Sequence, residues 1–320
     1  MATSGSFDHT VSTSDIIRDA LLTVQGIGAS QDVPGDVYSD SRRMLNGIVK
    51  MWQKKRINIW AQLECYVFVA PTAESYLLGP AATDAEWCTV DDFVGSVTTV
   101  ASSSGGSTVT VSSATGMTSG DRIGVELEDG TRQWTTINGA PAANVVTLAA
   151  TLTDDVPIGA TIYTYTSRPQ RPLRIIHARR RSTYTASDVP IDIEAHKEYF
   201  DQPSKSSAGS MNFVYYKPEL TSGRLYVWQR PNSVEELLGI TVERALSDMD
   251  NTDDDPDFPI EWQLPLVINL ARVIEPQYGQ LDAGRRAELR ADADRLFLEA
   301  QLGDAEMEST YIRPRRFGRR

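Results

Sequence analysis

The sequence predicts an α+β protein in which helices from both chain ends form one discontinuous four-helix domain beside a β-rich middle. Three observations predict this fold class. Apolar residues recur at helical spacing near both ends of the chain, and short alternating runs bounded by turn residues fill the middle. Residues 95–165 are rich in Ser, Thr, Gly and Val, with no charge between Asp92 and Asp121, which predicts an inserted small β-sandwich or barrel.

Length and composition agree with several domains in one globular chain. The chain has 320 residues, of which 41% are hydrophobic and 23% charged. The expected division is residues 1–62 with 256–310 for the helical domain, 63–94 with 166–255 for the β-rich domain, 95–165 for the inserted β domain and 311–320 for a basic C-terminal arm.

Two helices are expected in the N-terminal part. Ser12 and Ser14 are candidate N-caps, and Asp15 favours the first turn. The first helix carries an apolar stripe and ends at Gly26 and Gly28. A second helix is expected over residues 36–56. The two stripes are Ile16, Ile17, Ala20, Leu21 and Val24, then Val37, Met44, Leu45, Ile48, Val49 and Trp52.

Strands are expected through the middle of the chain. The Asp129-Gly130 pair is a strong hairpin signal, and Gly105-Gly106 separates another pair of strands. The expected strands of the β-rich domain are residues 65–70, 76–78, 173–178, 213–216, 224–228 and 237–242. Those of the inserted domain are residues 96–100, 108–111, 122–127, 133–137, 145–148 and 161–165.

Two more helices are expected near the C-terminus. The first carries Val267, Leu270, Ala271 and Ile274 on one face, and Pro265 is expected to kink or delay it. Pro276 and Gly279 are expected to stop it. A last helix begins at about Ala283 and carries an apolar face made of Leu289, Ala293, Leu296, Phe297 and Ala300.

The charge balance excludes a protein whose main task is to grip DNA phosphates. The formal net charge is −12, from 31 basic and 43 acidic residues. This balance suits a solubilised surface, or a surface that nucleic acid passes without sticking. No apolar run approaches the roughly 18 residues that span a bilayer, and no secretory signal or membrane contact is expected. Two cysteines, Cys65 and Cys88, favour a reducing compartment and form no zinc motif.

No catalytic motif is present. The sequence has no nucleophile elbow, His-Glu-x-x-His or phosphate-binding loop. Its three histidines are His9, in the N-terminal arm, His177, in an expected strand, and His196, beside an expected turn. We therefore expect a protein that is not an enzyme and has no cofactor or metal.

An acidic cluster precedes the C-terminal helices. Its oxygens suit a hard cation, but it lacks the glycine and the terminal glutamate of an EF-hand loop. A solvated loop is the favoured interpretation, and an acidic channel or interface loop repeated around a ring is a third. The six carboxylates are expected outside any core; they are Asp248, Asp250, Asp253, Asp254, Asp255 and Asp257.

Two basic clusters follow from the sequence. The first lacks the interleaved aromatic residues of a nucleic-acid site, so salt bridges within the subunit or to a neighbouring one are favoured. It consists of Arg168, Arg171, Arg174, Arg179, Arg180 and Arg181. The second is the C-terminal arm, either a disordered tail or a peptide arm that becomes ordered when it docks in an acidic groove. Its candidate binding residues are Tyr311, Ile312, Arg313, Arg315, Arg316, Phe317, Arg319 and Arg320.

Blocks along most of the chain resemble the tail-accessory proteins of short-tailed bacteriophages. These proteins are head-to-tail adaptors, also described as tail tubular or packaged-DNA stabilisation proteins. Residues 95–165 fall between two similar blocks, which supports an insertion. The similar blocks are residues 16–21, 43–52 and 59–60, then 75–79, 171–179 and 223–231, then 258–262, 270–272 and 277–279.

The resemblance implies a structural virion protein of the phage tail, assembled in the host bacterial cytoplasm. Copies are expected to form a ring, a dodecamer that matches the portal protein. The helical domain docks on the portal and the C-terminal arm extends along it. The β-rich part faces the downstream nozzle, needle or fibre proteins. The ring seals the channel after packaging, and double-stranded DNA passes it without specific binding.

Two other functions stay open. One is a virion-associated cell-wall hydrolase, which needs two carboxylates that flank a sugar-sized cleft. The other is a receptor-binding or decoration protein that acts through residues 95–165. We also expect the chain to be a monomer before it meets the portal, because an arm that orders on docking delays assembly until its partner is present.

Overall fold

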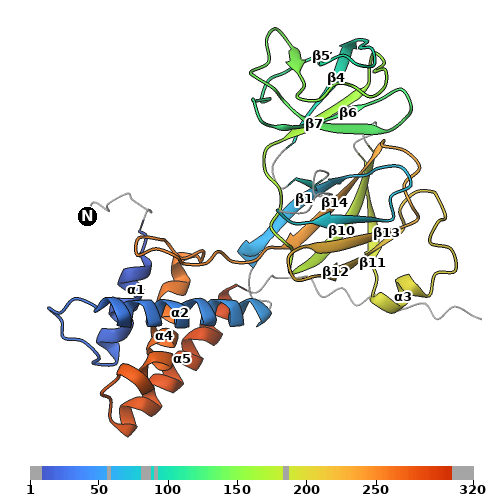
Figure 1. Ribbon diagram of the computed structural model, residues 1–320. Helices are drawn as coiled ribbons and strands as arrows, with labels where there is room; N and C mark the ends of the chain where they lie inside the picture. Colours follow the sequence, from blue (N-terminus) through green and yellow to red (C-terminus); the bar gives the residue numbers. More distant parts are fainter. Residues whose placement is uncertain (1–8, 56–58, 81–87, 90–92, 183–186, 305–320) are drawn as a thin grey trace, which may run out of the picture. The chain divides into compact units, whose positions relative to one another are not determined.

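The structure, a computed structural model, describes residues 9–55, 59–80, 88–89, 93–182 and 187–304. It is mixed α+β with a β-rich middle, as the sequence predicts (Figure 1). The chain divides into two compact units, Met1–Trp60 with Leu246–Arg320 and Ala61–Ala245. The first is the helical unit, and the second is the β unit.

Helices from both ends of the chain share the helical unit. They are α1 (Thr13–Thr23), α2 (Gly35–Trp52), α4 (Gln263–Tyr278) and α5 (Ala283–Gly303). Helix α4 contacts the other three helices and buries Leu270 and Ile274 completely. The Trp52 ring packs against Trp262 and Phe297, with ring centroids 5.5 and 5.0 Å away. These aromatic contacts join residues from the two ends of the chain in one core.

The N-terminus of α1 follows the predicted capping chemistry. The Ser12 hydroxyl accepts a hydrogen bond from the Asp15 backbone, and the Asp15 carboxylate accepts one from the Ser12 backbone, which completes a capping box. The C-terminus differs from the prediction, because Gln25 (φ 57°) adopts the left-handed conformation and not Gly26. Gly26 is instead needed for packing, since a Cβ there would lie 2.9 Å from the Tyr278 carbonyl oxygen.

Helix α5 begins at Ala283, as predicted, whereas boundaries of α2 and α4 differ from the expectation by a few residues. Helix α2 ends at Trp52 and continues as a 3₁₀ turn, Gln53–Lys55. Helix α4 begins directly after the 3₁₀ turn Ile260–Trp262, so Pro265 lies in its first turn, where a missing N–H breaks no helical hydrogen bond. Pro276 lies inside α4, which continues to Tyr278 and ends at Gly279.

The β unit contains an eight-stranded sheet. The neighbours are antiparallel except for the parallel pair β11–β12, in the order β2-β13-β12-β11-β10-β14-β1-β3. All six predicted strands of this region are present, and β3, β11 and helix α3 (His196–Phe200) are additional. The strands are β1 (Gln62–Phe68), β2 (Ser75–Leu78), β3 (Cys88–Thr89), β10 (Arg174–Ser182), β11 (Asp188–Ile193), β12 (Phe213–Pro218), β13 (Gly223–Trp228) and β14 (Glu236–Glu243).

Strand β11 was not predictable from apolar alternation. It contains Pro190 and two aspartates, and nearly all of its side chains are exposed. Proline and aspartate are depleted in strands, so pairing with β10 and β12 forms this strand rather than its own side chains. Strand β10 is longer than expected for a related reason, because its arginine run pairs with β11 and β14.

The inserted segment forms a separate six-stranded sheet that closes like a barrel. All six predicted strands are present, in the order β7-β6-β9-β4-β5-β8, and an antiparallel bridge between Ile137 and Leu148 joins the two ends. Gly130 (φ 78°) forms the predicted β6–β7 turn. The strands are β4 (Val94–Val100), β5 (Thr108–Val111), β6 (Arg122–Glu126), β7 (Arg132–Thr136), β8 (Val145–Thr147) and β9 (Thr161–Tyr165).

Candidate interaction surfaces

The acidic segment is bound to helix α1. We call residues 246–257 the acidic strap. The backbone N–H and the hydroxyl of Thr13 donate to the Asp254 carbonyl oxygen at 2.9 and 2.8 Å, and the Ser14 N–H donates to the Thr252 carbonyl oxygen at 3.1 Å. These N–H groups belong to the first turn of α1, where no helical acceptor is available. The strap therefore supplies backbone acceptors to the start of the N-terminal helix.

The acidic strap is also bound to helix α2. Asn46 forms two reciprocal hydrogen bonds of 3.0 Å with the Met249 backbone. The Lys50 ammonium donates to the Leu246 carbonyl oxygen at 2.8 Å and lies 2.6 Å from the Asp248 carboxylate. The side chains of Leu246 and Met249 are buried. The strap is thus a fixed part of the helical unit, although the sequence division placed residues up to 255 in the β-rich domain.

The six aspartates of the strap lie outside the core, as predicted. Asp248, Asp250, Asp253 and Asp255 are exposed, and Asp254 and Asp257 are half-buried. The Asp254 carboxylate accepts from the backbone N–H groups of Asn251 and Asp250, at 2.7 and 2.8 Å, and these bonds lower its pKa. The Asp257 carboxylate accepts from the Ser247 N–H at 3.0 Å.

The segment is a loop with mostly exposed carboxylates, in agreement with the favoured interpretation, and its backbone is in addition fixed by hydrogen bonds. Asp254 and Asp257 fix the strap backbone, while the exposed carboxylates form an acidic surface on the helical unit. In the part of the chain that the structure describes, no group of three or more His, Cys, Asp or Glu side chains is arranged to hold a metal ion.

Four arginines of the first basic cluster pair with acidic residues of the same chain. Arg174 pairs with the buried Glu243, and Arg180 lies 3.6 Å from Glu236. Arg181 forms a bidentate pair with Asp188, at 2.7 and 2.8 Å, which lowers the pKa of that carboxyl. Arg179 also contacts Asp188, at 3.5 Å, and lies 2.7 Å from Glu64.

Strand alternation places Arg179 and Arg181 on one face of β10 and Arg180 on the other. Arg179 and Arg181 both lie over the Tyr66 ring, 6.0 and 5.6 Å from its centroid. Arg168 and Arg171, which precede the strand, are half-buried. The intramolecular pairs account for the arginines of β10, and an inter-subunit role of the cluster stays a prediction.

The remaining predicted groups are not brought together. His9, His177 and His196 are exposed and lie on different segments, and His196 stacks on Phe200 with ring centroids 4.3 Å apart. The C-terminal arm, with Tyr311, Ile312, Arg313, Arg315, Arg316, Phe317, Arg319 and Arg320, lies outside the described residues.

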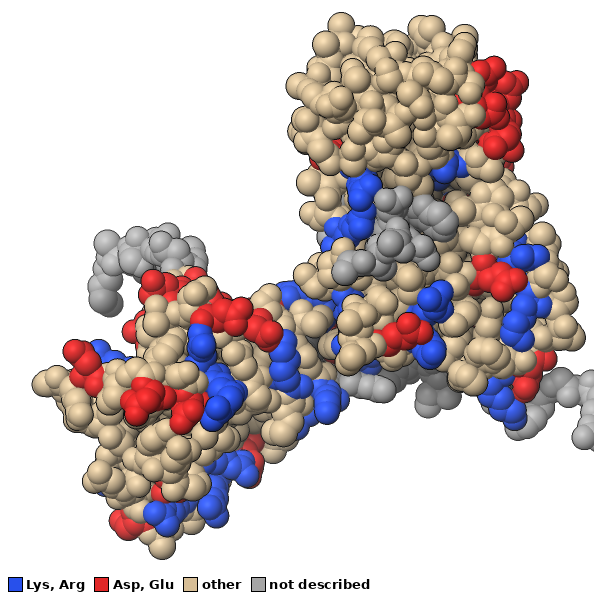
Figure 2. All heavy atoms as spheres, viewed as in Figure 1, with Lys and Arg blue, Asp and Glu red and all other residues tan. Residues whose placement is uncertain are grey.

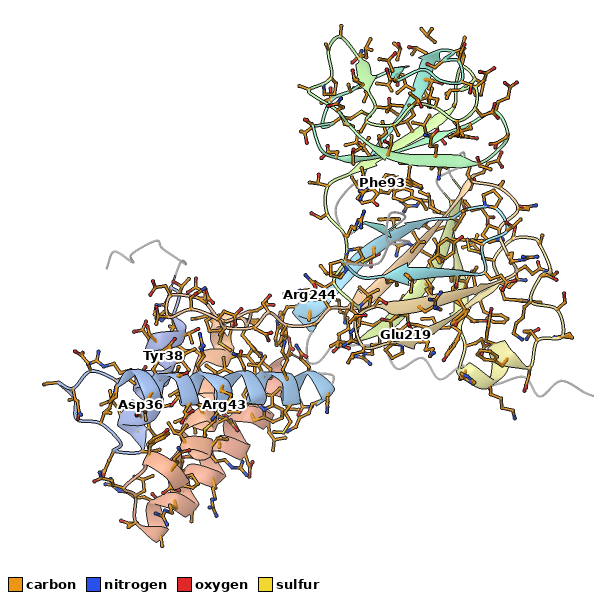
Figure 3. All side chains as sticks on the ribbon, in the orientation of Figure 1. Asp36, Tyr38, Arg43, Phe93, Glu219 and Arg244 are labelled. Carbon is orange, nitrogen blue, oxygen red and sulfur yellow. The ribbon has the colours of Figure 1, made fainter. Side chains whose placement is uncertain are left out.

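An aromatic cluster joins the barrel to the large sheet. Phe93, at the entry to the barrel, packs against Phe68 of β1 and Tyr163 of β9, with ring centroids 5.4 and 5.2 Å away (Figure 3). The Arg132 guanidinium lies 4.8 Å from the Tyr163 ring centroid and donates to the Val234 carbonyl oxygen at 3.1 Å. Burial lowers the pKa of Arg132. The barrel is therefore packed on the sheet and is not held by the chain connections alone.

The barrel surface contrasts with the rest of the molecule in charge. On its visible face, Figure 2 shows few charged side chains apart from an acidic group at one edge. Several aliphatic side chains of the barrel are exposed, with Ile158 the most exposed at 70%. The others are Val97, Val100 and Val145.

The helical unit exposes larger apolar side chains, which the sequence analysis did not single out. Met51 and Val273 border a hollow between α2, α4 and α5, whose floor includes Trp52 and Phe297. Leu264 borders a second hollow between the start of α4 and the end of α5. Leu298 and Leu302 are exposed on α5. Their i, i+4 spacing outside the predicted stripe is the sequence signal that marks them.

Comparisons add no family or relative. The chain matches no protein-family model, and no curated protein matches it in sequence. Within the described ranges, no helix is both long and apolar enough to cross a bilayer.

Proposed function

We propose that this chain is a structural virion protein, the head-to-tail adaptor of a short-tailed bacteriophage. In this proposal, copies form a ring below the portal, extend and seal the DNA channel after packaging, and provide the platform for the rest of the tail. The resemblance along the sequence supports the family. The observation that carries a docking role is the exposed apolar surface on α2, α4 and α5.

The helical unit is the portal-docking part in this proposal. Large side chains such as Met51 and Val273 are exposed around a hollow with an aromatic floor. Exposed apolar patches on a soluble protein mark surfaces that a partner covers. Lys55, which lies 3.9 Å above the Phe297 ring centroid, and the Arg272–Asp294 pair give the hollow a polar rim. An apolar centre with a polar rim is the usual anatomy of a protein interface.

The acidic strap supports the second part of the proposal, passage of DNA without binding. The exposed carboxylates of Asp248, Asp250, Asp253 and Asp255 lie on a segment that hydrogen bonds fix to α1 and α2. Repeated around a ring, this segment gives a negative surface, which repels the phosphate backbone. The net charge of −12 acts in the same direction.

A matched pair of variants tests the docking role. Val273→Asp places a charge at the hollow, and Val97→Asp places one on the barrel at the same exposure, 43% against 42%. We expect the unchanged chain and Val97→Asp to form a ring on the portal, measured by light scattering and electron microscopy. Val273→Asp lowers portal affinity by at least tenfold, because a buried charge without a partner costs more than about 1.4 kcal/mol. A chain that ignores the portal in every form contradicts the proposal.

The barrel supports a second candidate, a receptor-binding or decoration function. Its exposed aliphatic side chains, Ile158 above all, lie on a closed domain with its own hydrophobic core. Deletion of residues 95–165 that leaves assembly intact and changes host range supports this function. Deletion that leaves host range unchanged and prevents attachment of the next tail component assigns the barrel to the adaptor.

A further inference from the structure

The hollow at the end of α5 combines an apolar floor with an acidic rim. Its floor includes Trp262 and Leu296, and the exposed Leu264 borders it. The volume of the hollow is about 440 Å³, within the range of about 300–1,000 Å³ for binding pockets. Two exposed carboxylates also line the hollow, Glu261 from the 3₁₀ turn Ile260–Trp262 and Glu299 from α5. We call this hollow, formed by residues 259–265 and 296–304, the terminal groove.

The chain leaves the described structure at this groove. Gly303 and Asp304 line it, and residues 305–310 connect them to the arm. Six extended residues span roughly 20 Å, so the arm can turn back over the groove that it leaves. A short tether keeps the local concentration of the arm near the groove in the millimolar range. Even weak contacts then suffice for docking within one molecule.

The chemistry of the arm matches that of the groove. Tyr311, Ile312 and Phe317 supply apolar side chains for the floor, and the arm carries five arginines toward an acidic rim. Guanidinium groups form bidentate pairs with carboxylates. Long-range attraction between the positive arm and the acidic residues of the groove brings the two together. Both rim carboxylates are exposed, and that of Glu299 lies 3.3 Å from the Arg295 guanidinium.

We propose that residues 311–317 of the arm dock in the terminal groove of their own chain. Docking holds the arm until a partner offers a better site. The intramolecular docking does not depend on the proposed function. Its consequence for assembly, a delay until the portal displaces the arm, rests on that function.

Trypsin cleavage of the arm in the full chain, without portal, tests this inference. Arg313 precedes Pro314 and is not a trypsin site, so the sites within residues 311–317 are Arg315 and Arg316. We expect cleavage after these two residues, followed by mass spectrometry, to be about tenfold slower than in a free peptide of residues 308–320. A docked fraction near 90% gives this protection. The protection is independent of protein concentration, because the site and the arm belong to one molecule.

Two matched pairs of variants locate the docking site. Leu264→Asp removes apolar contact in the groove, and Leu298→Asp is its control, since both leucines are 55% exposed and Leu298 does not line the groove. Glu261→Lys reverses a rim charge, and Glu288→Lys makes the same change elsewhere on the exposed surface of α5. We expect the two groove variants to restore cleavage to the rate of the free peptide and the two controls to keep the protection.

The alternatives have distinct outcomes. An arm cleaved as fast as the free peptide in the unchanged chain overturns the inference. Protection that increases with protein concentration assigns the arm to the groove of a second copy and also overturns intramolecular docking. If the chain binds the portal but its arm is not protected from trypsin, the docking is rejected and the adaptor function is retained.

Discussion

The barrel and the helical unit are closed by opposite kinds of contact. The barrel is made from one continuous segment, and the bridge that closes it joins Ile137 to Leu148. The helical unit is closed by hydrogen bonds between the two ends of the chain, such as Asn46 to Met249, 203 residues apart. Contacts between distant residues carry a larger loop-closure cost and form later in folding. The barrel is therefore closed within one segment of the chain, whereas the helical unit needs both chain ends.

The two regions also differ in what they leave exposed. The helical unit exposes Met51, Leu264, Leu298 and Leu302 around hollows and on α5. The barrel exposes smaller aliphatic side chains on a surface with few charges (Figure 2). This difference indicates that the helical unit carries the larger apolar surface for a partner, while the barrel is complete by itself and packed on the large sheet.

Core substitutions give the largest expected effect and test whether the two regions unfold separately. Leu270 in α4 and Ile162 in β9 are both completely buried. Replacement of either by alanine is expected to cost about 2–5 kcal/mol, because a cavity remains. In hydrogen exchange measured by mass spectrometry, Leu270→Ala increases exchange in the helices and Ile162→Ala increases it in the barrel. Increased exchange everywhere in both variants contradicts separate units.

The aromatic cluster between barrel and sheet is the next test. Phe93→Ala removes a ring that contacts Tyr66, Phe68 and Tyr163, with centroids 5.1–5.4 Å away. We expect a loss of about 1–3 kcal/mol, since the ring is half-buried. Exchange increases at β1, β9 and the segment that enters the barrel, while the barrel core keeps its protection. Phe93→Leu, which retains apolar contact, is the control and shows a smaller change.

Detachment of the acidic strap from α2 has an expected effect of similar size. Asn46→Ala removes two hydrogen bonds to Met249 and leaves its backbone N–H and C=O without these partners. The expected cost is about 1–3 kcal/mol of helical-unit stability. Thermal unfolding followed by circular dichroism, with exchange at residues 246–257, measures it. Met51→Ala, an exposed residue of the same helix, is the control; equal losses in both variants show that the strap does not stabilise the unit.

The pH dependence of the strap is the smallest expected effect. Backbone hydrogen bonds from Asn251 and Asp250 lower the pKa of Asp254 in the folded chain. Its contribution is therefore complete above the unfolded pKa of about 3.9 and is lost as the pH falls through the lower folded value. NMR titration is expected to show the Asn251 amide responding to this carboxyl below pH about 4. Asp253→Asn leaves the response unchanged and Asp254→Asn abolishes it.

The sequence predicted most elements of both regions, for reasons that are local. The barrel strands follow from period-two alternation and Gly-containing turns, and α1 follows from Ser12 and its apolar stripe. Strand β11 was missed because Pro190 and its aspartates carry no strand pattern, and only pairing with its neighbours forms it. The arginines of β10 were predicted as a cluster, but their partners come from distant strands.

The sequence by itself determined the α+β class, the helices at both ends, the six strands of the insert and the exposure of the acidic carboxylates. Helix and strand propensity, side-chain periodicity and the cost of burying a charge depend on a residue and its neighbours along the chain. The sequence alone therefore predicts the features that follow from them. Only the tertiary structure decided that the strap supplies acceptors to α1 and α2, that the barrel packs through Phe93, and that an acidic groove lies at the end of α5. Each of these depends on contacts between distant residues, which the periodicity of one segment does not contain.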